Sequence, residues 1–551
     1  MNAVPPRQLD HLGDFAATRR ILVIAALALP IGVLSAGVAW CLLRLIGLIT
    51  NVVFYDRFGT ALVAPGAGPH SPLVILLAPA CGGLVIGLMA RFGSEKIRGH
   101  GIPEAIESIL VNGSRVQPRV ALLKPVASAI AIGTGGPFGA EGPIIMTGGA
   151  FGSIWAQLLH LTADERKTLL VAGAAAGMAA TFNAPLASVL LAVELLLFEW
   201  RPRSFVPVTA AVAVATILRV PMLGSGALFP APPGPLHLDA AAYALCAVAG
   251  LVAGLLALVA TSLVYLSEDT FHRLPIHWMW WPAIGGLVVG LGGLVVPQAL
   301  GVGYNVIGAE LDGSIAVNLL VGILVVKTLI WSLSLGSGTS GGVLAPMLMI
   351  GGALGGLEAE VFPHVAAGFW PLIGLAGVLG GVMRSPLTGV VFALELTHRF
   401  DAILPLMIGS TVAFAVSVLV LRRSVLTEKI ARRGLHLTRE YSIDPLEVLF
   451  VGDVMSAAVP PAAANGDGDG APTVFADDTL RHVAYVMAEC GQTKLPVAAR
   501  EEPHHPLGSI SLEQLLEGRL RDLHEERHGE RVLRPLELIR QSRERDGRPV
   551  G

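Results

Sequence analysis

One acidic residue of the chain, Glu141, stands inside a cluster of glycines and prolines, residues 135–143, within an otherwise apolar stretch. Two further clusters of this kind, 99–104 and 341–346, interrupt other apolar stretches. In each cluster glycines lead to a proline and then to a helix-compatible run, and proline is favoured in the first helical turn. Each cluster therefore predicts the N-terminus of a helix, where free N–H groups and a partial positive charge attract anions.

Glu141 has the sharpest chemical meaning among these residues. Converging helix N-termini would bind an anion without a buried cation. The binding would then be weak enough for the anion to leave again. The Glu141 carboxylate would compete with that anion, and its protonation, which burial favours, would release it. Glu141 is therefore predicted to be a gate and a candidate proton carrier. The alternative is an ordinary first-turn acid that only complements the helix dipole.

The composition shows which elements must position these clusters. The chain has 551 residues, 53% hydrophobic and 14% charged, whereas soluble proteins carry about 25% charged residues. Of its 38 basic and 41 acidic residues, 39 in total lie in the last 130 positions. The first 421 residues are therefore very poor in charge, which excludes a soluble enzyme and a disordered chain. A net charge of −3 excludes a nucleic-acid binder. The remaining class is a polytopic protein of the lipid bilayer with a small soluble tail.

The apolar runs between residues 21 and 421 are of two kinds. The run 21–54 is long enough to cross about 30 Å of hydrocarbon and to tilt, whereas others, such as 120–133, are too short. Short and glycine-broken runs predict helices that stop inside the membrane, which is tolerated where the freed backbone lines a polar cavity. Most of the 65 glycines are predicted to allow close packing between helices.

An internal repeat divides the apolar region. Four matches recur in the same order at offsets of 201 to 203 residues: 99–101 with 301–303, Lys124 with Lys327, 142–152 with 345–355, and 183–195 with 384–396. The membrane part is therefore predicted to consist of two related halves, roughly 30–215 and 240–421. Duplicated halves are typical of transporters, which bind substrate between the repeats.

The three clusters, in this order, resemble the signature regions of the CLC family of chloride channels and chloride/proton antiporters, whose motifs run G-S-G-I-P, G-[KR]-E-G-P and G-x-F-x-P. The resemblance extends through Lys124, 183–186, 385–389 and 395–397, and covers about residues 30–435. It implies an all-α polytopic membrane fold with two inverted repeats of about nine helices each, many of them broken or tilted. It also implies a homodimer with one independent anion pathway in each subunit.

The resemblance implies which residues form the pathway. Glu141 matches the external gating glutamate, and the backbone N–H groups of Val343 and Leu344 match those that hold the central anion. The residues expected around the anion are His100, Gly101, Ile102, Gly139, Ala140, Gly142, Val343, Leu344 and Leu426.

Four of these positions depart from the family pattern. The coordinating serine is His100 here, the basic residue before the gate is Ala140, the phenylalanine of the third motif is Leu344, and the pore tyrosine is Leu426. Backbone donors would therefore carry more of the anion binding. His100 could replace the serine through a ring N–H, and a charged ring would add pH sensitivity near its usual pKa of about 6.5. The alternative is a helix-end residue that points away from the pore.

The proton route is the second departure. Antiporters of this family carry an internal glutamate after a Glu matched by Glu194, but that position is Leu195 here, which cannot carry a proton. This favours a passive channel, or a proton route through water or another acid. Glu199 lies one turn further along the same face if the helix continues. It is the candidate substitute in the proton pathway, and a solvated acid at a helix end is the alternative.

The sequence thus predicts a transporter of chloride or a similar small anion that is gated by Glu141. Its coupling to protons is left open, and fluoride or nitrate is the alternative cargo. The four cysteines lie far apart, so no metal site is predicted, and no cofactor is expected.

The charged tail resembles a CBS domain in its segments 451–455, 477–480, 495–497 and 508–511. Only one copy is evident, and it could pair with its counterpart in the other subunit. The acid that often contacts a nucleotide ribose is Gln514 here, which argues against a nucleotide site and favours a structural tail. The expected division is an N-terminal segment 1–20, a transmembrane domain 21–435, a linker 436–450, a small α/β CBS-like domain 451–530 and a polar tail 531–551.

Basic residues flank the membrane part. They are Arg7, Arg19 and Arg20 before it, and Arg422, Arg423, Lys429, Arg432 and Arg433 after it. By the positive-inside rule both termini are cytoplasmic, and a bacterial inner membrane is the expected location.

One alternative belongs to another class. Residues 338–341 read Gly-Thr-Ser-Gly inside an apolar region, as in intramembrane serine proteases. That chemistry needs a base beside Ser340, and His160 and His398 are candidates only by elimination. We expect the Ser340 cluster to be the repeat partner of the gating region instead, and the protein not to be an enzyme.

Overall fold

The computed structural model describes residues 18–110, 113–232, 234–433, 444, 446, 449–457, 472–517 and 520. The chain divides into two compact units, Ala17–Arg439 and a second made of Met1–Ala16 with Glu440–Gly551. Most of the expected N-terminal segment, most of the expected linker and all of the polar tail 531–551 lie outside the described residues.

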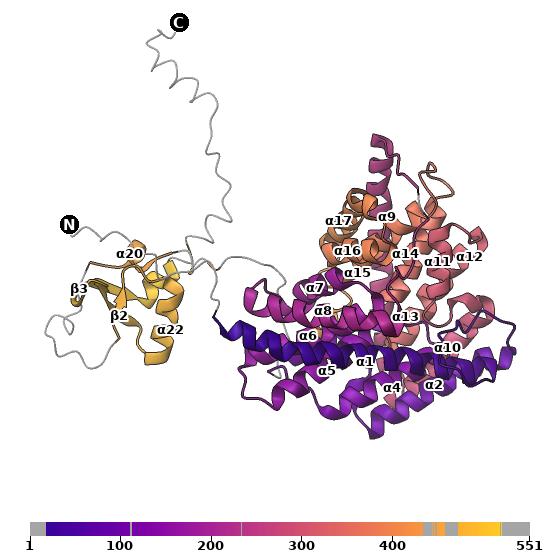
Figure 1. Ribbon diagram of the computed structural model, residues 1–551, viewed down its shortest axis with the longest axis horizontal. Helices are drawn as coiled ribbons and strands as arrows, with labels where there is room; N and C mark the ends of the chain where they lie inside the picture. Colours follow the sequence, from indigo (N-terminus) through magenta and orange to yellow (C-terminus); the bar gives the residue numbers. More distant parts are fainter. Residues whose placement is uncertain are drawn as a thin grey trace, which may run out of the picture. The chain divides into compact units, whose positions relative to one another are not determined.

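The first half of the large unit is built from helices of very unequal length (Figure 1). They are α1 Arg20–Tyr55, α2 Pro72–Phe92, α3 Ile102–Leu110, α4 Pro118–Gly133, α5 Glu141–Gln157, α6 Ala163–Phe182, α7 Pro185–Leu191 with its extension η2 Ala192–Leu197, and α8 Pro202–Leu223, with a short turn η1 Glu95–Ile97 before α3.

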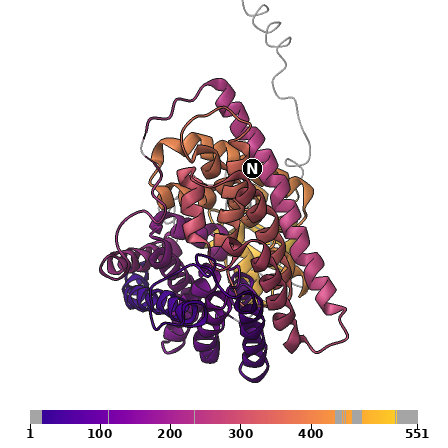
Figure 2. The ribbon, with the colours of Figure 1, turned by 90° about the vertical axis from the view of Figure 1, so that its right-hand side faces the viewer.

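The second half repeats this pattern of long and short helices (Figures 1 and 2). It contains α9 Ala240–His272, η3 Trp278–Trp280, α10 Trp281–Val295, η4 Pro297–Ala299, α11 Tyr304–Asp312, α12 Val317–Gly322, η5 Ile323–Lys327, α13 Thr328–Gly336, α14 Leu344–Glu358, α15 Phe369–Met383, α16 Pro386–Thr397, η6 Phe400–Ala402, α17 Ile403–Val420 and α18 Thr427–Arg432.

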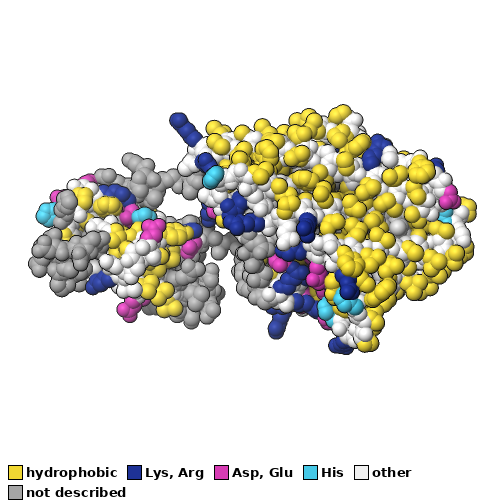
Figure 3. Space-filling model, turned by 90° about the horizontal axis from the view of Figure 1, so that it is seen from below, with side chains coloured by type: hydrophobic (Ala, Val, Ile, Leu, Met, Phe, Trp, Pro, Cys, Tyr) yellow, Lys and Arg dark blue, Asp and Glu magenta, His cyan; other side chains and the backbone are white. Residues whose placement is uncertain are grey.

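Length decides where each helix lies. Among the described residues, seven helices or continuous runs of helices, including α1, α2 and α9, are long and apolar enough to cross a membrane. Their outward side chains are apolar, and yellow hydrophobic surface covers most of this unit in Figure 3. Shorter helices such as α5 and α14 are buried along almost their whole length. The long helices therefore enclose a layer of short ones, as the glycine-broken runs predict.

The two halves meet at a point of local symmetry. Gly139 and Gly342, which are related by the repeat offset of 203, pair with each other in an antiparallel bridge. The Gly342 N–H donates to the Gly139 carbonyl at 2.9 Å, and the reverse bond measures 3.4 Å. Equivalent segments that run in opposite directions through one point are related by a local two-fold axis, as two inverted repeats are. The fold class expected from the sequence, all-α with two inverted repeats, is confirmed.

The smaller unit carries a three-stranded sheet. Its described elements are α20 Val451–Val454, β1 Val474–Phe475, α22 Leu480–Cys490, β2 Lys494–Ala499 and β3 Glu502–Ser511. The strand order is β1-β2-β3, with β1 parallel and β3 antiparallel to β2. Its small apolar core includes Val451, Leu480 and Leu495. This α/β tail is the minor component that the sequence predicts.

Candidate functional site

The N-termini of α5 and α14 lie side by side because the Gly139–Gly342 bridge joins the segments that precede them. Both helices begin inside the protein, and their first residues, Glu141 and Leu344, are completely buried. A buried helix N-terminus has free N–H groups that require an acceptor. The point where the two repeats meet therefore has N–H donors that suit an anion, and the anion site of the glycine clusters stays a prediction.

The carboxylate of Glu141 supplies an acceptor at this point. The Ala345 N–H donates to Glu141 Oε1 at 3.0 Å, and the Leu344 N–H also points at the carboxylate. The other oxygen, Oε2, has no hydrogen-bond partner among the described residues. Glu141 begins α5, yet its side chain caps α14, a helix of the other repeat. The carboxylate thus lies against the N–H of Leu344, which the resemblance assigns to the anion, and that of Ala345, which it does not.

Glycines on both sides make room for this arrangement. A Cβ added to Gly139 would overlap Glu141 Oε2, and one added to Gly342 would lie 2.5 Å from Oε1. Behind the carboxylate, a Cβ at Gly142 would overlap the His100 carbonyl. Gly101 has a φ of 92°, which favours glycine, and it lies on the other side of this contact, next to Gly142. These glycines are needed for close approach, which is a sharper role than general helix packing.

The residues expected around the anion come from four separate segments. His100, Gly101 and Ile102 precede or begin α3, Gly139, Ala140 and Gly142 surround the start of α5, Val343 and Leu344 begin α14, and Leu426 precedes α18. All nine are buried. Backbone contacts join the first three groups, through Gly101 with Gly142 and Gly139 with Gly342.

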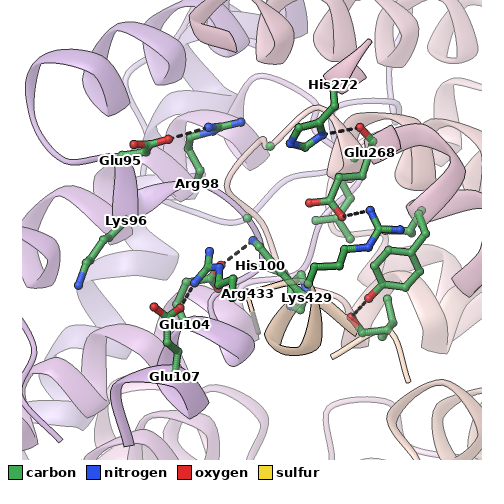
Figure 4. Close-up of a pocket in the computed structure, with 18 of the residues that line it drawn as sticks. Glu95, Lys96, Arg98, His100, Glu104, Glu107, Glu268, His272, Lys429 and Arg433 are labelled. Carbon is green, nitrogen blue, oxygen red and sulfur yellow. Dashed lines mark hydrogen bonds and ion pairs between the residues drawn. The ribbon is translucent and has the colours of Figure 1, made fainter. Parts of the chain in front are cut away.

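A cavity of about 600 Å³ opens beside this point and is lined by residues of both halves and of α18 (Figure 4). His100 lines it, although only 4% of the residue is exposed. Its Nδ1 has no hydrogen-bond partner among the described residues. The side chain therefore borders the cavity, whereas the alternative reading has it pointing away.

Ion pairs surround this cavity and tie α18 to the rest of the unit. Lys429 Nζ donates to Glu104 Oε1 at 2.6 Å, and the Gly101 N–H donates to the other oxygen at 2.8 Å. Arg432 pairs with Asp269 of α9 at 2.5 Å. A buried or half-buried acid is thus matched by a base at each of these positions, so the cavity carries no large excess of either sign.

A tyrosine near Leu426 was not foreseen from the sequence. Leu426 itself is an apolar, completely buried residue. The hydroxyl of Tyr265, from α9, donates to the carbonyl of the preceding residue, Val425, and lines the same cavity. Because its proton is already donated, this hydroxyl does not restore the missing donor. Its sequence position, 161 residues before Leu426, gives no signal of this proximity.

Two buried lysines hold the turns that lead into the site. Lys124 Nζ donates to the carbonyls of Ile97 and Gly99, at 2.8 and 2.6 Å. Lys327 Nζ donates to Ala299 and Gly301, at 2.9 and 2.7 Å. Each lysine therefore fixes the turn before α3 or α11 of its own repeat. The repeat alignment matched these lysines without indicating what they bind.

Two acids that the alignment also matched cap helices across the repeats. Glu395 accepts the N–H groups of Leu186 and Ala187, at 2.9 and 2.8 Å, at the start of α7. Glu194 accepts the N–H and the hydroxyl of Thr388, at 3.0 and 2.5 Å, at the start of α16. Glu194 is thus a structural cap, and its neighbour Leu195 is a completely buried apolar side chain.

Glu199 does not extend the face of Leu195, because the helix does not continue to it. The extension η2 ends at Leu197, and Phe198 takes a left-handed conformation with φ 54°. Glu199 instead hydrogen-bonds Ser204 and forms ion pairs with Lys167 at 3.9 Å and Arg203 at 3.3 Å. Burial alone would raise the pKa of Glu199, but Ser204 and the two cations outweigh it and lower the pKa below its usual value. The helical spacing argument for a proton route is therefore wrong.

The serine protease alternative finds no support in the geometry. Ser340 is completely buried, and its hydroxyl hydrogen-bonds that of Ser128 at 2.8 Å. His160 and His398 are exposed residues at helix ends. Neither is among the described partners of Ser340, so the described part of the chain places no base beside this hydroxyl. No group of three or more His, Cys, Asp or Glu in that part could hold a metal ion.

The fold and the site define an α-helical membrane transport protein in which two inverted repeats bring helix N-termini together at a buried acid. The chain belongs to the voltage gated chloride channel family, whose pattern matches residues 82–418. It is 33% identical over 413 residues to the H(+)/Cl(−) exchange transporter ClcA of Salmonella paratyphi B. That match covers 70% of this chain and 84% of the relative. The same values hold for the ClcA of Salmonella newport.

Solved structures share the fold. A slow cyanobacterial Cl−/H+ antiporter is 23% identical with a TM-score of 0.64, covering 76% of this chain and 99% of its own. A CLC-type fluoride/proton antiporter is 20% identical with a TM-score of 0.63, covering 73% and 97%. A eukaryotic CLC transporter is 19% identical with a TM-score of 0.61, covering 92% and 89%.

Proposed function

We propose that this protein moves chloride or a similar small anion past the N-termini of α5 and α14, and that Glu141 is the gate. The observation that carries the proposal is the Glu141 carboxylate lying against the N–H groups of Leu344 and Ala345. A carboxylate and a chloride ion are alternative occupants of the same partial positive charge.

The gating step follows from the chemistry of the carboxylate. As an anion, Glu141 holds the N–H groups of α14 with charge-assisted hydrogen bonds. When a proton binds, the side chain loses its charge and becomes a weaker acceptor, so an anion can replace it. Val343 and Leu344 then offer backbone donors, and His100 borders the cavity from which the anion would arrive.

A flux assay tests this gate. Purified protein in liposomes is given an outward chloride gradient, and chloride release is followed between pH 4.5 and 7.5. We expect release to rise with acidity in the natural protein, and to become independent of pH in Glu141→Gln, whose neutral amide mimics the protonated acid. Glu358→Gln, a change at another buried acid, should keep the pH dependence. A pH-dependent flux in Glu141→Gln would contradict the gate.

Exchange of chloride for protons is the second candidate, because the relatives at 33% identity are named H(+)/Cl(−) exchange transporters. Against it, Leu195 is apolar and completely buried, and Glu199 is held in ion pairs. A pH probe in the same vesicles separates the two readings. Proton uptake against its own gradient, lost in Glu141→Gln, would establish exchange, and its absence would leave a passive channel.

The anion is the remaining variable. The side chains around the site include no hydroxyl donor at positions 100 or 426, so backbone N–H groups carry the recognition. One solved structure of this fold is a fluoride/proton antiporter, which makes fluoride a necessary comparison. Tracer flux of chloride, fluoride and nitrate in the same vesicles ranks the three. We propose chloride as the preferred ion.

We further propose that two copies form a homodimer in a bacterial inner membrane, with a pathway in each copy and both termini in the cytoplasm. Two leucines at equivalent positions of the repeats, Leu186 and Leu387, are 63% and 53% exposed. Such exposed apolar side chains suit an apolar environment.

For the tail we propose a CBS-like structural role. Its Gln514 side chain already accepts the Ser511 N–H at 2.8 Å, so it is engaged in its own backbone.

A further inference from the structure

A second buried acid lies near the gate, and nothing in the proposed mechanism uses it. Glu310 is on α11, and only 1% of the residue is exposed. Neither of its carboxylate oxygens has a hydrogen-bond partner among the described residues. A Cβ added to Gly352 of α14 would overlap Glu310 Oε2, so this carboxylate packs directly on α14. An unpaired buried carboxylate is costly, and binding a proton removes that cost.

The position of Gly352 places Glu310 on the same side of α14 as the gate. Ala345, which donates to Glu141, and Gly352 are seven residues apart on this helix. Seven residues make almost two full turns, so both face one way and are about 10 Å apart along the axis. Met349 lies between them, and its Sδ would be 2.5 Å from a Cβ at Gly303.

Lys327 joins the two acids. Its ammonium would be 3.8 Å from the same Cβ at Gly303. This places the ammonium beside Met349, between Ala345 and Gly352 on α14. It is completely buried, and both Glu141 and Glu310 act on it electrostatically. Its hydrogen bonds go to two backbone carbonyls, so its charge is not matched by a bonded carboxylate. One buried cation therefore serves two acids.

Other charges are sparse around this group. Among the described helices, α14 and α15 pack most closely against α11; α15 carries no charged residue, and α14 carries only Glu358, at its last position. On α11 itself, Asp312 ends the helix and Tyr304 begins it, and the Tyr304 hydroxyl lies in the field of Glu141. In the other repeat the acid at the repeat offset of 203, Glu107, forms an ion pair with Arg433, so this counterpart is paired.

We propose that Glu310 is a second proton-binding residue of the pathway, and that its charge sets the pH at which Glu141 is released. The inference rests on the proposed gating function. The step is the addition of one proton from water to a carboxylate oxygen, and its reversal. Acids that share the field of one cation titrate together, and a negative charge on Glu310 makes proton binding at Glu141 easier. Neutralising Glu310 should therefore require more acid to open the gate.

The test is the pH midpoint of chloride release in Glu310→Gln. We expect the midpoint to move toward acid by about one pH unit, the effect of a unit charge near 10 Å at an effective dielectric constant of about 20. The maximal rate at low pH should remain. Glu358→Gln is the matched control, because Glu358, on α14, is likewise a buried acid without a hydrogen-bond partner among the described residues, and Lys327 does not act on it. Its midpoint should stay unchanged.

Two outcomes would overturn the inference, and a third would overturn the proposed anion transport on which it rests. An unchanged midpoint in Glu310→Gln, or an equal shift in Glu358→Gln, rejects Glu310 as the coupled acid. No chloride release from the natural protein rejects the proposed function instead. If Glu310→Gln does not fold, infrared difference spectra of Glu141→Gln/Glu358→Gln keep the test open. A buried carboxylic acid band that forms on acidification is expected there, and its absence would overturn the inference.

Discussion

At the scale of single residues, Glu141 shows how a local motif can have a distant partner. A first-turn acid normally complements the dipole of its own helix. Glu141 occupies that position in α5, yet its carboxylate accepts from Ala345, which lies 204 residues further along the chain. Both roles are compatible with the sequence, and the contact across the repeats is the observation that supports the proposed gate.

His100 offers the sharpest test of side-chain recognition. His100 lines the cavity, and its buried Nδ1 has no hydrogen-bond partner among the described residues. The ring is therefore the candidate side-chain donor for the proposed anion. We expect His100→Phe, which keeps an aromatic ring but no donor, to weaken chloride binding by about 2- to 10-fold, the effect of one lost hydrogen bond. His100→Asn, which keeps a donor, should retain most of the affinity. Isothermal titration with chloride measures both, and equal affinity in all three proteins would mean that His100 does not contact the anion.

The residues that the sequence identifies are those that belong to a local pattern. Glu141, Gly139 and Gly142 stand in one cluster, so their proximity could be predicted without a fold. Tyr265 and Glu310 could not be identified in this way, because each is one of several polar residues in its helix, and its role depends on residues more than 30 positions away. Glu199 was misplaced because the left-handed Phe198 ends its helix, and phenylalanine gives no signal of such a turn.

At the scale of elements, helices of each repeat are completed by acids of the other. Glu395 of α16 caps α7, and Glu194, beyond the end of α7, caps α16. A short helix buried in the protein leaves N–H groups that water cannot reach, and each such group costs about 1–3 kcal/mol if unpaired. The repeat alignment showed these two acids as equivalent. It could not show that each serves the opposite half, because alignment carries no contact information.

This exchange of caps predicts an effect on stability. We expect Glu395→Ala to lower the free energy of unfolding by about 1–3 kcal/mol, since the N–H groups of Leu186 and Ala187 lose their acceptors. The temperature of aggregation in detergent, followed by size exclusion, should fall accordingly. Glu360→Ala, at an exposed acid after α14, should leave it unchanged. The prediction fails if both variants lose stability equally.

At the scale of the whole molecule, the division between charge-poor and charge-dense parts of the sequence matches the two compact units. Within the large unit, the charged residues that line the cavity of Figure 4 come from segments far apart in the sequence, among them Glu95, Arg98 and Lys429. Composition predicts a membrane unit and a soluble one. It does not predict that acids and bases of both halves line one cavity, the entrance of the proposed pathway.

The side of the membrane that this entrance faces can be tested directly. By the positive-inside rule, the basic residues after α17 lead us to expect the chain end in the cytoplasm, and α18, which carries two of them, lines the cavity. The cavity should therefore open to the cytoplasm. The 36-residue helix α1 is about 54 Å long, so the loop after it, with Phe58 94% exposed, should lie on the opposite side.

Single cysteines report this arrangement once the four natural cysteines have been replaced. We expect Lys96→Cys, in the cavity lining, to react with a membrane-impermeant maleimide in inside-out vesicles and not in right-side-out cells. Phe58→Cys should show the reverse pattern and serves as the matched control for reagent access. Because α2 alone separates these two positions, a single crossing must lie between them. Labelling of both from one side would contradict the crossing, and exchange of the two patterns would contradict the orientation.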